Sequence, residues 1–132
     1  MKPTICVDFD GVIHSYDWGW LNGEIYGEAV PGFFEWLESV RHYFTVVVYS
    51  TRSKTVEGRL KMSDWIYSKR DKWIAESPRT LIREPLDLQF ASEKPAAVVI
   101  IDDRAIQFRG DWNSPGLSLE GLTNFKPWNM EK

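Results

Sequence analysis

The chain contains a single cysteine, Cys6, among its 132 residues. One cysteine cannot form a disulfide bond within the chain or supply the four ligands of a structural zinc site. Cys6 lies in an apolar run, where a thiol is usually a buried structural group. We therefore expect a reducing compartment, the cytoplasm, for this protein.

Long apolar segments are lacking as well. The longest apolar runs, such as residues 96–101, are far shorter than the roughly 20 residues that cross a bilayer. The first residues do not show the basic region and long apolar stretch of a secretory signal. We expect no membrane span and no membrane partner.

Neither an excess of basic charge nor a linker-like composition is present. The 16 Lys and Arg residues stand against 19 Asp and Glu residues, and the net charge of −3 does not favour nucleic acid through the overall field. A local basic patch remains compatible with these numbers. No run rich in Gly, Ser or Pro divides the chain, so we expect one domain over residues 1–132. Tryptophan, in contrast, is abundant, with seven residues, and we expect most of them to pack in or against the core.

Two kinds of regular segment alternate along the chain. Three segments are apolar and rich in β-branched residues, which is typical of strands covered on both faces: residues 3–9, 45–50 and 97–101. Two segments have apolar side chains at helical spacing, regular over residues 32–43 and looser over residues 55–76. This alternation predicts an α/β fold, a three-layer α/β/α sandwich with a mainly parallel, Rossmann-like sheet.

The remaining segments are less regular. Residues 12–30 indicate a long loop with a possible small hairpin, and such loops are usually functional. Within residues 77–95, the pieces 80–82 and 86–90 are compatible with minor strands or with turns. Residues 105–108 are compatible with one more short strand, and the tail from Gly110 onward is expected to be irregular.

Oxygen-bearing side chains follow each predicted strand: Asp8 and Asp10, Ser50 and Thr51, and Asp102 and Asp103. Because the carboxyl ends of parallel strands meet at one edge of a sheet, where ligands bind, we expect these groups to share a site. Four carboxylates in one crevice repel one another, so their pKa values rise or a divalent cation binds among them. Oxygen ligands without a His or Cys cluster favour Mg²⁺ together with a phosphate.

The ordered segments Ile5-Cys-Val-Asp8-Phe-Asp10-Gly11-Val12, Val46-Val-Val-Tyr49-Ser50 and Val98-Val-Ile-Ile101-Asp102-Asp103 resemble the motifs of the haloacid dehalogenase (HAD) superfamily. These motifs span most of the chain. The resemblance implies a HAD-like fold with a minimal cap. It also implies a Mg²⁺-dependent phosphomonoester hydrolase that works through an aspartyl-phosphate intermediate.

The resemblance also implies individual roles for the acids. Asp8 would be the nucleophile, and Asp10 the general acid that later acts as the base. Mg²⁺ would contact the Asp8 carboxylate, the Asp10 backbone carbonyl and Asp103, with Asp102 orienting its neighbour.

Four further residues are candidates for binding the phosphate. Ser50 would donate a hydrogen bond to a phosphate oxygen, helped by backbone amides near Thr51. Arg52 is expected either to contact the phosphate or to form a surface salt bridge. Lys94 is the candidate for the basic residue that offsets the charge of the phosphorylated intermediate.

The loop 12–30 offers candidate substrate contacts in His14, Trp18 and Trp20, with packing as the competing role for the aromatic side chains. Because the cap is small, a nearly open site would admit large substrates. The sequence Asp102-Asp103-Arg104, together with Arg52, resembles polynucleotide 3′-phosphatase domains and deoxyribonucleotidases. A nucleotide or a nucleic-acid end is therefore the first expectation, and another phosphorylated small molecule the second.

Two other functions compete with this one. A receiver-like phosphoacceptor domain of a signalling protein also gathers Asp, hydroxyl and Lys side chains at a parallel sheet, but its acid pair follows the first strand. A catalytically idle binding protein on the HAD fold is the third possibility, although all the expected acids are present here. No oligomeric state is predicted.

Overall fold

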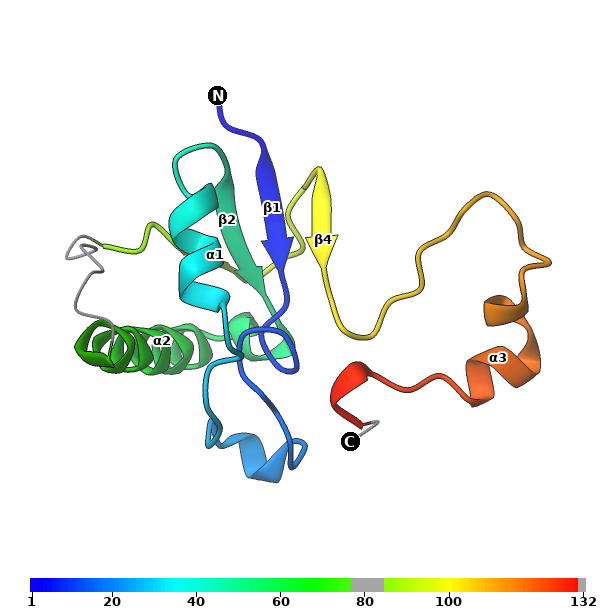
Figure 1. The fold of residues 1–132 in the computed structure, drawn as a ribbon, viewed down its shortest axis with the longest axis horizontal. Coiled ribbons are helices and arrows are strands. Elements are labelled where there is room, and N and C mark those ends of the chain that lie inside the picture. Colours follow the sequence, from blue (N-terminus) through cyan, green and yellow to red (C-terminus); the bar gives the residue numbers. More distant parts are fainter. Residues whose placement is uncertain (77–84, 131–132) are drawn as a thin grey trace.

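The structure, a computed structural model, describes residues 1–76 and 85–130. Its centre is a four-stranded, all-parallel sheet with the strand order β3-β2-β1-β4 (Figure 1). The strands are β1 (Thr4–Val7), β2 (Thr45–Tyr49), β3 (Gln89–Ala91) and β4 (Val99–Ile101). The predicted α/β class with a parallel sheet is confirmed, and the topology is consistent with a Rossmann-like fold.

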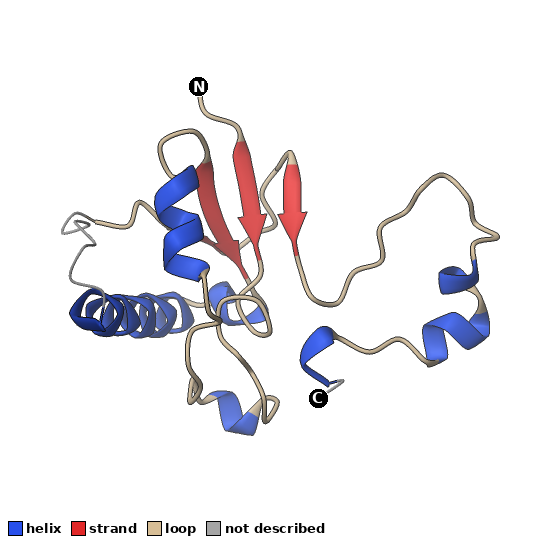
Figure 2. Cartoon of the chain, viewed as in Figure 1, coloured by secondary structure: helices blue, strands red, loops and turns tan. Residues whose placement is uncertain are grey.

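Three α-helices accompany the sheet in the described residues: α1 (Phe33–Val40), α2 (Val56–Glu76) and the short α3 (Leu119–Thr123) (Figure 2). The hydroxyl of Thr55 accepts the backbone N–H of Gly58 at 3.0 Å and so caps the start of α2. Both long helices lie within the ranges predicted from the apolar spacing. No helix in the described part of the chain is long and apolar enough to cross a membrane.

One apolar core joins both long helices to one face of the sheet. The expected third layer is not seen in the described residues, because the connection from β3 to β4, residues 92–98, forms no helix on the other face. Ile5 and Val7 alternate with Cys6 on β1, and the parallel register sets them beside Val46 and Val48 of β2. Phe33, Phe34 and Leu37 of α1, with Met62 and Ile66 of α2, complete this buried cluster. Full burial of one such side chain contributes about 1.5–3 kcal/mol, so this face carries much of the fold's stability.

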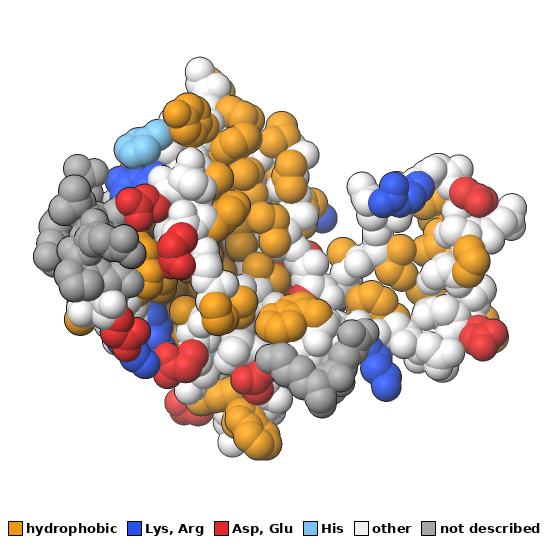
Figure 3. Space-filling model, viewed as in Figure 1, with side chains coloured by type: hydrophobic (Ala, Val, Ile, Leu, Met, Phe, Trp, Pro, Cys, Tyr) orange, Lys and Arg blue, Asp and Glu red, His pale blue; other side chains and the backbone are white. Residues whose placement is uncertain are grey.

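The strand predicted over residues 97–101 differs from expectation because it is not buried. Among the described strands β4 lies at the edge of the sheet, where it pairs with β1 alone, and Val98 and Ile100 are 65% and 47% exposed. The connection from β3 to β4, residues 92–98, contains no helix that would cover the strand. Figure 3 shows the resulting apolar side chains at the surface over the strands.

Two further expectations concern the segments on either side of β4. Residues 86–90 contain the start of β3, whereas residues 80–82 lie outside the described part of the chain. Residues 105–108 do not form the additional strand that their composition suggested. The Asp102 carboxylate accepts the backbone N–H of Arg104 at 2.8 Å, and this local turn leads the chain away from the sheet.

The carboxyl-terminal segment leaves β4 in an extended arc and returns to the loop after β1 (Figure 1). Its return is marked by two hydrogen bonds, from the Trp128 indole N–H to the Gly11 carbonyl at 2.7 Å and from Asn129 to the Ser15 carbonyl at 3.2 Å.

The expectation that most tryptophans pack in or against the core is wrong. Trp36, Trp65 and Trp73 pack against the core. The other four lie at the surface, because they belong to the loop after β1 and to the carboxyl-terminal segment rather than to the helices: Trp18, Trp20, Trp112 and Trp128.

Candidate functional site

Three carboxylates meet where β1 and β4 end. The register pairs Val7 with Ile101, and the Asp8 backbone N–H donates to the Ile101 carbonyl at 2.9 Å. As a result, one carboxylate oxygen each of Asp8, Asp102 and Asp103 lies within 4.8 Å of the others. The expectation that acids distant in the chain converge at the carboxyl edge of the sheet is confirmed for these three.

Asp103 is the least satisfied member of the cluster. Its side chain is 1% exposed, and neither carboxylate oxygen has a hydrogen-bond partner among the described residues. A β-carbon on residue 11 would overlap with this carboxylate, and Gly11 has a φ of +84°. Glycine therefore serves here both for its backbone conformation and for the space that Asp103 occupies. The Nε of Arg104, on a mostly exposed side chain, lies 3.9 Å from one Asp103 oxygen. So distant and solvated a charge compensates a buried carboxylate only in part, so this arrangement suits a bound cation.

Two acids of the cluster, Asp8 and Asp103, have raised pKa values. Burial raises the pKa of Asp8 to about 7, the charges of Asp102 and Asp103 add to the rise, and the Phe9 backbone N–H opposes it. Burial also raises the pKa of Asp103. Asp102 is exposed, and its carboxylate accepts the Arg104 N–H. Of the two adjacent acids, Asp103 is the one whose two oxygens are both buried and free of hydrogen bonds from the described residues, which makes it the better candidate for a direct ligand.

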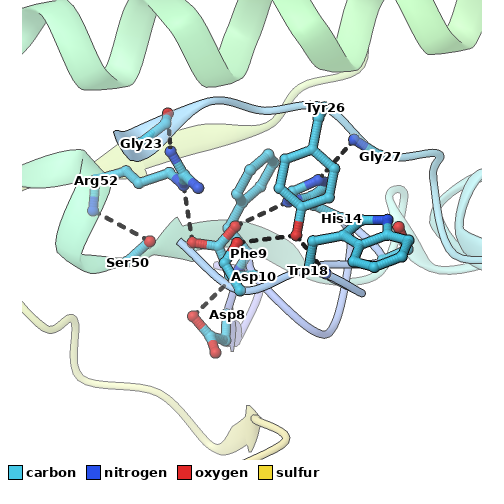
Figure 4. Close-up of polar contacts among 12 residues, drawn as sticks. Asp8, Phe9, Asp10, His14, Trp18, Gly23, Tyr26, Gly27, Ser50 and Arg52 are labelled. Atoms are coloured by element: carbon cyan, nitrogen blue, oxygen red, sulfur yellow. Dashed lines mark hydrogen bonds and ion pairs between the residues drawn. The ribbon is translucent and has the colours of Figure 1, made fainter. Parts of the chain in front are cut away.

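Asp10 points away from this cluster (Figure 4). One of its carboxylate oxygens lies 2.9 Å from His14 Nδ1, and the other accepts the Nε–H of Arg52 at 2.8 Å. The Asp10 side chain is mostly buried. Two carboxylates only two positions apart thus have separate surroundings, one among acids and one between an imidazole and a guanidinium.

The two basic neighbours of Asp10 are both buried. His14, a candidate substrate contact, has no exposed surface and lies behind Asp10, where its Nε2 accepts the Gly27 backbone N–H at 2.9 Å. Arg52 forms a buried ion pair and not a surface salt bridge. Its Nη1 donates to the Gly23 carbonyl at 2.6 Å, whereas its Nη2 has no hydrogen-bond partner in the described residues.

The remaining candidates for phosphate contact surround the same edge of the sheet. Ser50 is buried directly after β2, and its hydroxyl oxygen accepts the Arg52 backbone N–H at 3.2 Å, so the hydroxyl proton can still be donated. Thr51 is exposed at the start of a 3₁₀ turn. Lys94 follows the end of β3. Burial raises the pKa of the Cys6 thiol on β1, and the charge of Lys94 opposes that rise.

Trp18 and Trp20 lie on the exposed side of the loop, with 75% and 50% of their surface accessible. Trp20 stacks over the Arg52 guanidinium, 4.5 Å from ring centroid to Cζ. A groove lies between this part of the loop and the start of α2 and is lined by Trp20, Asn22, Thr51, Arg52 and Lys61. Packing in the core, the competing expectation for Trp18 and Trp20, is therefore wrong.

Sequence reasoning missed the parts of the site that are supplied by the backbone. Gly23 offers a carbonyl to Arg52, and Gly27 offers an N–H to His14. A β-carbon on Gly27 would overlap with the Ser15 hydroxyl and lie 2.8 Å from His14 Nε2. The glycine itself was the only signal in the sequence, because the absence of a side chain permits this close approach.

Comparisons of the chain with protein-family models, with curated proteins and with solved structures found no match.

Proposed function

We propose that the protein is a Mg²⁺-dependent phosphomonoester hydrolase of the HAD type, with a HAD-like, minimally capped fold. The observation that supports this most strongly is the buried carboxylate of Asp103, which accepts no hydrogen bond from the described residues and lies beside Asp8 and Asp102. Hard oxygen donors without a nearby thiolate or imidazole in the cluster suit Mg²⁺.

The residues fit such a cation. The Asp8 and Asp103 carboxylates and the Asp10 backbone carbonyl would hold it, and Asp102 would orient its neighbour. When bound, the cation neutralises charge on the phosphate oxygens and on the attacking carboxylate. Its charge would also offset the repulsion that raises the pKa of Asp8.

The chain's own residues then divide the reaction into two displacements. An Asp8 carboxylate oxygen attacks phosphorus, the bond from phosphorus to the leaving oxygen breaks, and Asp10 supplies the proton to that oxygen. Water then attacks the phosphorus of the aspartyl phosphate, Asp10 takes a proton from the water, and the bond from phosphorus to Asp8 breaks. Asp10 thus loses a proton in the first displacement and regains one from water in the second.

The phosphate is held by groups at the ends of β2 and β3. The Ser50 hydroxyl donates to a phosphate oxygen, the backbone near Thr51 adds a donor, and Lys94 balances the charge of the intermediate. Arg52 is already bonded to Asp10, so its contribution to phosphate binding comes from the unpartnered Nη2.

A nucleotide or a nucleic-acid end is the substrate class that we favour over other phosphorylated small molecules. The loop after β1 carries two exposed tryptophans, Trp18 and Trp20, which offer flat surfaces on which a base can stack. The groove beside Trp20 provides room for the part of the substrate beyond the phosphate.

The test is hydrolysis of p-nitrophenyl phosphate and of a panel of mononucleotides and 3′-phosphorylated oligonucleotides, with and without Mg²⁺. We expect Mg²⁺-dependent turnover that falls by at least about a thousandfold in Asp8→Asn, because the nucleophile is lost. The matched control is Asp71→Asn, which changes an exposed acid on α2 and should retain full activity.

Three results would argue against the proposal. Activity that survives Asp8→Asn would exclude Asp8 as the nucleophile. Phosphorylation of the chain by acetyl phosphate without turnover would indicate a phosphoacceptor domain. No activity on the panel, with no Mg²⁺ binding by calorimetry, would indicate an idle binding protein.

A further inference from the structure

We propose that His14 and Arg52 are positioning residues that hold the Asp10 carboxylate between them and tie its direction to the loop of residues 15–29. This inference rests on the proposed function, since it concerns how Asp10 is presented for proton transfer. The proposal assigns a role to His14 and Arg52, two buried basic side chains that form hydrogen bonds with the loop backbone and with Asp10 and none with the acid cluster.

The hydrogen bonds of His14 determine where its proton lies. The Gly27 backbone N–H can only donate, so His14 Nε2, 2.9 Å away, must be the unprotonated acceptor. The ring proton therefore lies on Nδ1 and is donated to the Asp10 carboxylate oxygen at 2.9 Å. The neutral Nδ1–H tautomer is thus the one that a backbone group of the loop selects.

The imidazole ring has no space in which to turn. Tyr26 and Trp65 meet it edge-on with ring centroids at 5.0 and 5.4 Å, and Phe9 stacks at 5.7 Å. Tyr26 is itself held by its hydroxyl, which accepts the Trp18 N–H and donates to the Gly19 carbonyl. The ring orientation is thereby fixed by residues of the loop and of α2.

Arg52 mirrors this arrangement on the other oxygen of Asp10. Its Nε–H donates to Asp10 at 2.8 Å, and its Nη1 donates to the Gly23 carbonyl at 2.6 Å. The guanidinium lies beneath Trp20. Each oxygen of Asp10 is therefore bonded to a donor whose other end is held by the loop backbone (Figure 4).

The loop conformation is one that must be maintained by such contacts. Tyr16, Leu21 and Asn22 have φ values of +57°, +39° and +57°, which side chains other than glycine rarely adopt and which cost free energy locally. If the loop relaxed, Gly23 and Gly27 would move, and both donors to Asp10 would lose their fixed positions. The loop conformation and the direction of Asp10 are thus linked.

The first test compares His14→Phe, which keeps a flat ring without the donor, with His14→Asn, whose amide N–H can occupy the position of Nδ1–H. We expect His14→Phe to lower kcat by about tenfold to a hundredfold with little change in KM, because a small misplacement of a reacting group has effects of this size. His14→Asn should recover a large part of that loss. His42→Phe, at an exposed histidine, is the matched control and should behave as the wild type.

The second test moves His14 without altering it. In Gly27→Ala the new β-carbon would press on Ser15 and on His14 Nε2, whereas in Gly116→Ala nothing lies within 4 Å of it. We expect kcat to fall in Gly27→Ala and to be unchanged in Gly116→Ala, with KM similar in both. This pair decides the matter if His14→Phe does not fold.

A third readout does not depend on activity. Nitrogen-15 NMR of the imidazole should show His14 as the neutral tautomer protonated at Nδ1. A proton on Nε2, or full kcat in folded His14→Phe and in Gly27→Ala, would overturn the inference while leaving the phosphatase proposal intact. A wild type without Mg²⁺-dependent activity would instead contradict the proposed function, and the tautomer would still test the placement of His14.

Discussion

Ionised Asp8 and Asp103 side chains would bind a cation, but their ionisation lowers the stability of the folded chain. Their burial among like charges raises both pKa values, that of Asp8 to about 7, because the charged forms lose water and repel each other. A carboxylic acid whose pKa is higher in the folded chain than in the unfolded chain binds protons on folding. Its ionisation therefore destabilises the folded state, and a cation at the same place would remove that cost.

Stability without metal should consequently decrease as pH rises. Asp8 has an ordinary pKa of 3.8 and a folded pKa of about 7, so its cost grows between these values and is complete above pH 7. We expect the Tm of the metal-free protein to fall from pH 5 to pH 8, and Mg²⁺ to raise Tm at pH 8 more than at pH 5. Circular dichroism melts would measure this.

The matched variants for this experiment are Asp8→Asn and Asp103→Asn, which should each flatten the decline, and Asp71→Asn, which should leave it unchanged. Glu28 does not complicate this measurement. Its lysine partners lower its pKa from the ordinary value of 4.5, so its contribution to stability changes at and below about pH 4.5 and not between pH 5 and pH 8. A Tm that rises from pH 5 to pH 8 would contradict the assignment of the burial cost to this cluster.

The two long helices differ in how well their apolar spacing predicts which side chains are buried. In α1 the regular apolar spacing corresponds to three buried side chains, whereas the looser pattern of α2 corresponds to only two, Met62 and Ile66. Leu60 belongs to the same helix and is apolar, yet 58% of its surface is exposed. Apolar identity alone therefore does not reveal which side of α2 meets the sheet.

A pair of truncations on α2 tests this assignment. Ile66→Ala should lower the free energy of unfolding by about 2–5 kcal/mol, because it leaves a cavity in the core. Leu60→Ala should change it by less than about 0.5 kcal/mol, as is usual at the surface. Urea unfolding measures both, and equal losses would show that the two faces of α2 had been assigned incorrectly.

The carboxyl-terminal segment is hydrogen-bonded to the loop after β1. Trp128 donates to the carbonyl of Gly11, the residue that makes room for Asp103, and Asn129 donates to Ser15 at the start of the loop. Residues more than a hundred positions apart thus share one small region. The segment is therefore part of the support of the acid cluster.

Removing one of these bonds should be measurable as a loss of stability. Trp128→Phe keeps an aromatic ring but deprives the Gly11 carbonyl of its donor, and we expect the free energy of unfolding to fall by about 1 kcal/mol. Trp112→Phe, at a more exposed tryptophan of the same segment, is the control and should have little effect. Urea unfolding that is identical for both variants and the wild type would contradict this role of Trp128.

Much of the architecture and of the acid cluster could be predicted from local patterns. Apolar, β-branched runs followed by Asp or Ser identify strands whose carboxyl ends must meet in a parallel sheet. For this reason the proximity of Asp8, Asp102 and Asp103 was predictable. The parallel pairing rule converts residues distant in the chain into neighbours without any knowledge of side-chain packing.

The surroundings of Asp10, the exposure of β4 and the path of the tail depended on the folded chain. The ion pair of Arg52 with Asp10 joins residues 42 positions apart, and the bond from Trp128 to Gly11 joins residues 117 positions apart. Apolar runs such as that of β4 are the same whether or not another element covers them. Contacts between distant segments decide burial and the direction of side chains, because hydrogen bonds and packing depend on positions in space and not on spacing along the chain.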